Sequence, residues 1–221
     1  MPIMKSLVIL ISGRGSNMQA LIEAELPLKV AAVISNNPGA AGLEITKKHG
    51  IETRVVDHRT YSNREAFDAA LAATIDLYQP DLVTLAGFMR VLGDDFVNHY
   101  QGRLMNIHPS LLPAFPGLDT HARALREGVK THGCTVHFVT PNLDHGPIII
   151  QAAVPVLPDD TEQTLEARVL QQERRIYPQA VRWFVEDKLR LRGDRVEIVH
   201  ESGNPATTYV DATLSPPGAQ E

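Results

Sequence analysis

An amide and an imidazole stand two residues apart in the segment LMNIHPSLLP, which spans residues 104–113. The apolar residues around Asn106 and His108 are typical of a buried strand, and alternate residues of a strand point to the same face. Pro109 then restricts the backbone where the strand ends. Because an amide can stabilise a developing oxyanion and an imidazole can move a proton, this pair predicts a reaction centre.

A carboxylate that could support this pair is Asp144, in the turn-like segment LDHGP at 143–147. Beside His108 it would stabilise an imidazolium and fix the ring's orientation. Aspartate is equally common in turns that do nothing chemical, and spacing alone does not show that the two residues meet. The sequence has no Gly-x-Ser-x-Gly segment, and Cys134 lies inside an expected strand. Without a covalent nucleophile, the trio favours direct group transfer between two bound substrates.

A glycine-containing loop, SGRGSN at residues 12–17, lies between an expected strand and helix. Glycine exposes backbone N–H groups at a helix N-terminus, which is a site for anions. A dinucleotide fingerprint would need glycine where Met18 stands, and a P-loop would need Gly-Lys-Ser/Thr. A single phosphate on Gly15, Ser16 and Asn17 fits best. The alternative is a tight turn in which Ser16 or Asn17 merely caps the helix.

The connection LAGFMRVL, residues 85–92, is apolar although it follows a strand. Open α/β sheets place ligands at such strand ends, so these side chains could line a slot for a flat heterocycle. Ordinary core packing is the alternative. Arg64, near an expected helix start, would either bind a carboxylate or remain a solvated charge, and the latter is commoner for surface arginines.

The nine histidines do not form a metal-binding pattern. His132, His137 and His145 lack helical spacing, and Cys134 has no partner thiol, so we predict no metal site. His137, in an apolar strand, is interpreted as a buried and satisfied histidine. His121 is expected near the site without an assigned role.

Composition narrows the class of protein. The 221 residues are 43% hydrophobic with a net charge of −5, which argues against tight nucleic-acid binding. A single cysteine indicates a reduced, cytoplasmic setting. The first apolar run, 7–11, is too short for a signal peptide or a membrane span.

Strands and helices alternate along the chain. Strands are expected at 7–11, 30–34, 53–56, 81–86, 104–108, 135–139 and 147–156, and helices at 18–25, 41–49, 62–78, 94–100, 120–127 and 161–188. This order predicts an α/β fold with a doubly wound, mostly parallel sheet of about seven strands, helices on both faces and some late antiparallel pairing. Ser62 and Glu65 predict a capping box. We expect one domain over 1–200, ending in a strand at 196–199, and a poorly ordered tail over 201–221.

Four of these segments, taken together and in order, carry a resemblance. They are 11–17, 85–90, 106–113 and 143–147, and with them residues 4 to 190 resemble the phosphoribosylglycinamide formyltransferases. The signature NxHPSLLP is specific to domains that transfer a formyl group from folate. The resemblance implies the Rossmann-like formyltransferase fold.

The resemblance also implies roles for individual residues. Asn106, His108 and Asp144 would be catalytic. The second substrate, a ribonucleotide, would contact Gly15, Ser16, Asn17, Gln172 and Glu173. The folate would contact Arg64, Met89, Arg90, Val91, Leu92, Asn106, Thr140, Pro141, Asn142, Leu143 and Asp144.

The implied reaction is attack by the amine of glycinamide ribonucleotide on the formyl carbon of the co-substrate 10-formyltetrahydrofolate, in purine biosynthesis. Asn106 and His108 would stabilise the oxyanion, and Asp144 would support His108. Small molecules are the expected partners, without metal, nucleic acid or membrane, and the chain would be a monomer or homodimer.

Three other functions compete. A 10-formyltetrahydrofolate deformylase resembles the same domain but usually carries an additional N-terminal domain, for which we expect no room here. A methionyl-tRNA formyltransferase would add a C-terminal nucleic-acid-binding domain, which the net charge does not favour. A non-catalytic folate or sugar-phosphate binding module would not need the trio of Asn106, His108 and Asp144.

Overall fold

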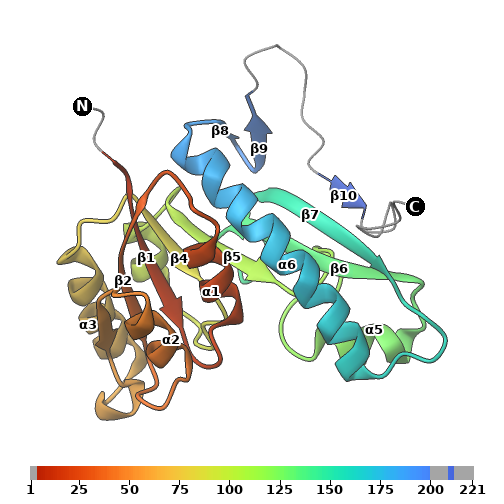
Figure 1. The fold of residues 1–221 in the computed structure, drawn as a ribbon, viewed down its shortest axis with the longest axis horizontal. Helices are drawn as coiled ribbons and strands as arrows, with labels where there is room; N and C mark the ends of the chain where they lie inside the picture. Colours follow the sequence, from red (N-terminus) through yellow and green to blue (C-terminus); the bar gives the residue numbers. More distant parts are fainter. Residues whose placement is uncertain (1–3, 200–208, 212–221) are drawn as a thin grey trace.

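The computed structural model describes residues 4–199 and 209–211. The main sheet has the order β10-β7-β6-β5-β4-β1-β2-β3 (Figure 1). Its strands are β1 (Ser6–Ile11), β2 (Lys29–Ser35), β3 (Thr53–Val55), β4 (Leu82–Leu85), β5 (Leu104–His108), β6 (Thr131–Phe138), β7 (Ile148–Pro155) and β10 (Tyr209–Asp211). The helices are α1 (Ser16–Glu23), α2 (Gly42–Lys48), the 3₁₀ turn η1 (His58–Thr60), α3 (Arg64–Asp76), α4 (Asp94–His99), α5 (Thr120–Glu127) and α6 (Glu162–Val185).

The pairing confirms a doubly wound, mostly parallel α/β sheet. Strand β1 pairs in parallel with β2 and β4, and β4 pairs in parallel with β5. Strand β6 runs antiparallel to β5 and β7, as the short turn between the last two long strands predicted. Strands β8 (Leu189–Arg192) and β9 (Arg195–Ile198) form a separate hairpin. Strand β10 lies in the segment 201–221, which was predicted to be a poorly ordered tail, and it pairs in parallel with β7. The other residues of that segment lie outside the described ones.

The central strands are buried on both faces, as in other parallel sheets. In β1, Leu7, Ile9 and Ile11 belong to one core, while Val8 and Leu10 belong to the other. Residues of α1, α2, α5 and α6 pack into the first core, and residues of α3 and α4 pack into the second. The two-residue period of a strand therefore supplies both layers from one sequence run.

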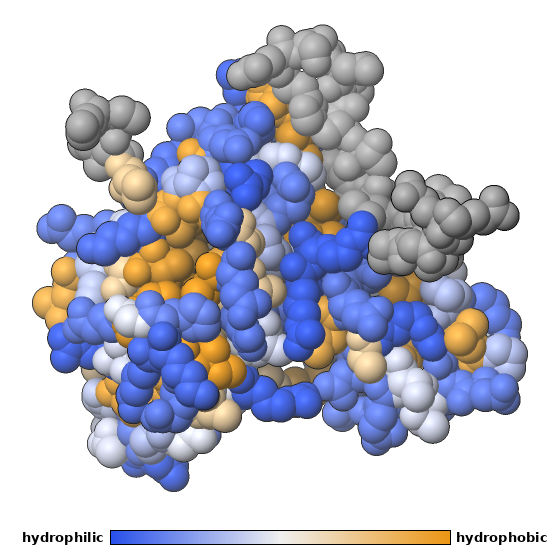
Figure 2. All heavy atoms as spheres, in the orientation of Figure 1, coloured by the Kyte–Doolittle hydropathy of each residue, from blue (hydrophilic) through white to orange (hydrophobic). Residues whose placement is uncertain are grey.

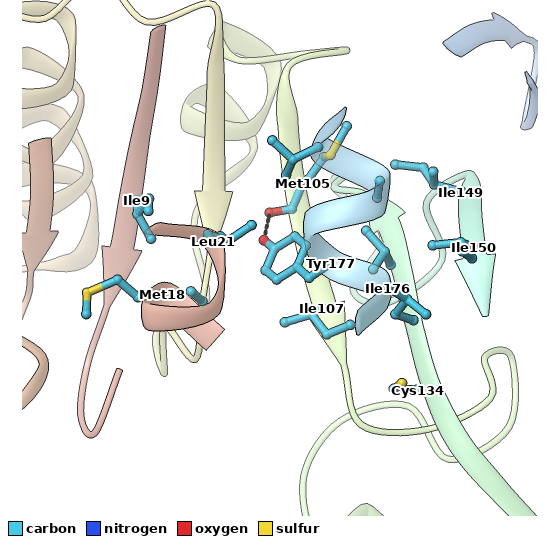
Figure 3. Packing of buried hydrophobic residues seen from close by; sticks show 14 of the residues in the cluster. Ile9, Met18, Leu21, Met105, Ile107, Cys134, Ile149, Ile150, Ile176 and Tyr177 are labelled. Carbon is cyan, nitrogen blue, oxygen red and sulfur yellow. Dashed lines mark hydrogen bonds between the residues drawn. The ribbon is translucent and has the colours of Figure 1, made fainter. Parts of the chain in front are cut away.

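Helix α6 is the longest helix and crosses the face of the sheet beside α1 (Figure 1). Its side chains at helical spacing, among them Leu165, Val169 and Ile176, are buried in the first core. Figure 2 shows hydrophilic residues over much of its outer surface. The buried Tyr177 donates from its hydroxyl toward the carbonyls of Leu85 and Met105, at 3.0 and 3.1 Å. Helix α6 therefore contacts the last residue of β4 and the second residue of β5, and Figure 3 shows the bond to Met105.

Two helices begin elsewhere than predicted. Asn63, not Ser62, is the N-cap of α3, because its extended backbone lets Oδ1 accept from the N–H of Ala66 at 2.8 Å. Helix α1 begins at Ser16, two residues earlier than predicted, because Gly15 takes the N-cap position with φ 77°. The first turn of α1 therefore starts inside the glycine loop.

We predict that Tyr177→Phe lowers the free energy of unfolding by about 1–3 kcal/mol, because it leaves buried carbonyls without their donor. Urea denaturation followed by circular dichroism measures this change. The control is Tyr78→Phe. The hydroxyl of Tyr78 accepts from Arg54 at the surface, so its removal should lower the free energy of unfolding by less than about 0.5 kcal/mol. Equal effects of the two variants would contradict the role of Tyr177.

Candidate active site

Strand β5 presents the predicted pair. Asn106 lies opposite His137 of β6, and His108 lies opposite Thr135. Because alternate and directly opposed residues share a face, these four side chains lie on the same side of the sheet. His108 is only 6% exposed, so its ring is held by protein groups rather than by water.

Asp144 reaches His108, which the sequence left open. The Nδ1 atom of His108 lies 3.6 Å from Oδ2 of Asp144, and its Nε2 atom lies 3.0 Å from the carbonyl of Phe115. Asp144 is in turn held by the N–H of Gly117, which donates to Oδ2 at 2.8 Å. An oxygen therefore faces each ring nitrogen, which fixes the orientation of the ring.

His137 belongs to the site, although its sequence context indicated only a buried structural histidine. Its Nε2 atom lies 3.3 Å from Nδ2 of Asn106 and 3.9 Å from Oδ1 of Asp144. Burial lowers the pKa of His137 to about 4, so the ring is neutral at pH 7. Its Nδ1 lies 2.9 Å from the carbonyl of Phe138 and donates to it, so Nε2 accepts from Asn106. This bond aims the amide of Asn106 and leaves its second N–H free for a ligand.

His121, which was expected near the site, lies against His132. Nδ1 of His121 is 3.2 Å from Nε2 of His132. Burial lowers the pKa of both rings, that of His132 to about 4. The pair joins α5 to β6 beside the site.

The glycine loop approaches a second helix closely. Gly15 has a left-handed backbone, and a Cβ atom there would lie 2.8 Å from the Cα of Gly42 at the start of α2. Only glycine fits this position. It turns the chain so that the backbone N–H groups of Ser16 and Asn17 begin α1.

Asn17 joins this loop to α6. Its Nδ2 donates to Oε2 of Glu173 at 2.7 Å, and both side chains are buried. Oδ1 of Asn17 is buried without a partner among the described residues. Gln172 is also buried, but its Oε1 accepts from Arg175 of the same helix at 3.0 Å. The structure therefore links Glu173 to the glycine loop, whereas the hydrogen bond described for Gln172 runs along α6.

The apolar loop after β4 is not ordinary core. Met89 and Val91 are 64% and 57% exposed, Arg90 is exposed and Leu92 is half-buried. The segment 140–144, which was also expected to contact the folate, is similar. Leu143 is 57% exposed, Pro141 and Asn142 are exposed, and Thr140 is half-buried. The loop that follows β4 and the loop that ends at Asp144 thus expose large apolar side chains that a ligand could cover.

Arg64 lies at the far end of the first loop. Its Nε atom is 3.8 Å from where a Cβ of Gly93 would lie, and Gly93 donates its N–H to Asp68 at 2.7 Å. Arg64, Asp68, Gly93 and Phe96 share the lining of a surface hollow. Arg64 thus lies beside Gly93, which directly follows the 89–92 segment.

Among the residues that the structure describes, no group of three or more His, Cys, Asp or Glu side chains has the geometry of a metal site. No helix within 4–199 is both long and apolar enough to cross a membrane.

The buried carboxyl group of Glu173 yields a prediction about stability. Burial raises the pKa of Glu173 above the ordinary 4.5. Above the pKa that this group has in the unfolded chain, the cost of burying the ionised carboxylate therefore lowers the stability of the fold, and below that pKa the protonated group carries no such cost. Glu173→Gln keeps an oxygen for Asn17 and removes the charge. We expect the variant to be more stable than the wild type at pH 7, and the difference to shrink toward pH 4.

Chemical denaturation at several pH values measures this difference. A matched control is Glu166→Gln, on the same helix but with its side chain 41% exposed. A Glu173→Gln variant that is less stable than the wild type at pH 7 would contradict the argument.

The comparisons with known proteins agree with this geometry. The formyl transferase family matches residues 4–181. The chain is 50% identical to the phosphoribosylglycinamide formyltransferase of Escherichia coli (strain K12), over 84% of this chain and 90% of that protein. The crystal structure of glycinamide ribonucleotide transformylase 1 from Symbiobacterium toebii superposes with a TM-score of 0.88 at 48% identity, covering 90% of this chain and 96% of that one.

A formyltetrahydrofolate deformylase from Pseudomonas syringae shares the fold with a TM-score of 0.84. It is 27% identical, over 90% of this chain and 67% of its own. Because the identity to the formyltransferases is far higher and covers nearly all of their length, the chain belongs to the phosphoribosylglycinamide formyltransferase family.

Proposed function

We propose that the protein transfers the formyl group of 10-formyltetrahydrofolate to the amine of N1-(5-phosphoribosyl)glycinamide, giving the N-formyl product and tetrahydrofolate in purine biosynthesis. The observation that carries this proposal is the buried contact of His108 with Asp144, beside an Asn106 amide aimed by His137. The family membership supplies the two substrates.

The ribonucleotide is assigned to the glycine loop. Its phosphate would accept from the backbone N–H groups of Gly15, Ser16 and Asn17, where the positive end of the α1 dipole favours an anion. Glu173, held by Asn17, would meet the glycinamide end. Glu173 lies one helical turn before Tyr177, whose hydroxyl contacts the carbonyl of Met105, so this end of the substrate would lie near Asn106.

The folate is assigned to the two exposed loops. The pterin would lie between the segments Met89–Leu92 and Thr140–Asp144, covering apolar side chains that now face solvent. Arg64 would bind a carboxylate at the other end of the molecule, where it lies near Gly93. This arrangement brings the formyl group to Asn106 and His108.

The reaction is a direct displacement. The substrate amine attacks the formyl carbon, and the carbonyl oxygen becomes an oxyanion that accepts from the free N–H of Asn106 and that the neighbouring ring of His108 stabilises. The bond from the formyl carbon to N10 of the folate then breaks. The amine loses a proton and N10 gains one, so charge and atoms balance. Asp144 keeps His108 oriented and stabilises its protonated form.

The remaining assignments concern the whole chain. We propose a single domain over 1–200 that acts in the cytoplasm, as a monomer or a homodimer, without a metal ion. The alternative activity is hydrolysis of the same folate, in which water replaces the amine as the attacking group.

Release of tetrahydrofolate from 10-formyltetrahydrofolate, followed by absorbance, tests the proposed reaction. We expect release by the wild type only when glycinamide ribonucleotide is present, because no other amine is positioned. Release at the same rate without the ribonucleotide would assign the protein to the hydrolases.

We predict that His108→Ala reduces kcat by about 10²–10⁴-fold, because it removes an acid–base group at the reacting carbonyl. Binding of tetrahydrofolate, measured by calorimetry, should change by less than about threefold, since the loops that hold the pterin remain. His49→Ala is the matched control, because His49 is exposed at the C-terminal end of α2. Normal turnover by His108→Ala would remove this residue from the mechanism.

A further inference from the structure

Ser12, the first residue of the glycine loop, contacts two segments that are distant in sequence. Its backbone N–H donates to the carbonyl of Gly87 at 3.2 Å. Its hydroxyl accepts from the N–H of Met89 at 2.7 Å and donates to Oδ1 of Asn36 at 2.6 Å. One side chain thus connects the glycine loop, the apolar loop after β4 and the end of β2.

The directions of these bonds follow from the donors available. A serine hydroxyl has one hydrogen, and the N–H of Met89 is itself a donor, so the hydroxyl hydrogen points to Asn36. Asn36 is only 3% exposed, and this acceptor holds the hydroxyl in one rotamer. A lone pair of Ser12 Oγ is then aimed at Met89. The carbonyl of Ser12 also accepts from Nδ2 of Asn37 at 3.3 Å, which restrains the residue further.

The exposed part of the loop after β4 depends on such backbone anchors because the side chains of Met89 and Val91 pack little, whereas Phe88 is buried in the second core. Met89 and Val91 are more than half exposed, so they add little burial energy in the absence of a ligand. The described anchors are Ser12 at one end and Asp68, which accepts from Gly93, at the other. Of the two, only Ser12 belongs to the loop assigned to the ribonucleotide.

We propose that Ser12 is a positioning residue that couples the two substrate sites. A phosphate bound to the glycine loop restrains Ser12, which restrains Met89 and thereby orders the loop that holds the folate. The folate then binds a loop whose ordering cost is already met, and it binds more tightly. By thermodynamic linkage, bound folate must tighten ribonucleotide binding by the same factor. This inference rests on the proposed function, since it takes its two ligands from there.

The coupling can be measured without turnover, because tetrahydrofolate carries no formyl group. Isothermal titration calorimetry gives the Kd of tetrahydrofolate with and without saturating glycinamide ribonucleotide. For the wild type we expect the ribonucleotide to tighten tetrahydrofolate binding about fivefold or more, which is in the range of allosteric couplings. For Ser12→Ala we expect less than about twofold tightening, because Met89 has lost its link to the glycine loop.

Two further variants separate positioning from a general loss of structure. Asn36→Ala should lower the coupling partly, because the hydroxyl of Ser12 remains but is no longer aimed. Ser6→Ala is the matched control at the other end of β1, where the hydroxyl donates to the carbonyl of Gln79. It should leave the coupling at the wild-type value. Thermal melting shows that each variant is folded before its coupling is interpreted.

The outcomes are distinct. Equal Kd values with and without ribonucleotide in the wild type would overturn the inference, and so would full coupling in Ser12→Ala. Neither result would affect the proposed reaction, which fails only if the wild type does not transfer the formyl group to the ribonucleotide.

Discussion

The contact between the ring of His108 and the carboxylate of Asp144 is the interaction on which the site depends. Both side chains are more than nine-tenths buried, and a carboxylate that is buried needs partners to offset its lost hydration. The groups that make and surround this contact come from two loops. The 109–119 loop supplies the carbonyl of Phe115 and the N–H of Gly117, and the β6–β7 loop supplies Asp144 itself. Forming this one contact therefore folds both loops over the end of β5.

The position of β5 in the sheet explains why ligands can meet there. Its parallel neighbour β4 leads into the exposed 87–92 loop, while its antiparallel neighbour β6 contributes His137 opposite Asn106. From the other side, α6 reaches β5 through Tyr177 and reaches the glycine loop through Glu173. The 87–92 loop, the glycine loop and α6 are thus linked to one another and to β5, although they come from different parts of the sequence.

Much of this arrangement was predictable from local patterns. The apolar run at 7–11 predicted a strand, and the spacing of Asn106 and His108 predicted a shared face. The alternation of strands and helices predicted the doubly wound sheet. Local rules were less reliable at helix starts, because Ser62 and Asn63 cap equally well and only the backbone of Asn63 has the required geometry.

Other features depend on contacts between distant segments, which no local pattern encodes. The role of His137 follows from the register between β5 and β6, and the sequence alone indicated only its burial. The approach of Asp144 to His108 depends on a left-handed backbone at Asp144 and on Gly117. The bonds of Ser12 join segments 24 and 77 residues away. The functional residues were thus easier to predict than the residues that position them.

The fate of the formyl carbon tests the central claim most directly. With ¹³C in the formyl group of 10-formyltetrahydrofolate and glycinamide ribonucleotide present, ¹³C NMR distinguishes an N-formyl amide from free formate. Transfer between two substrates that meet at Asn106 and His108 predicts that the label appears in the ribonucleotide product, with formate near background. Label that accumulates as formate while the ribonucleotide remains unmodified would contradict it.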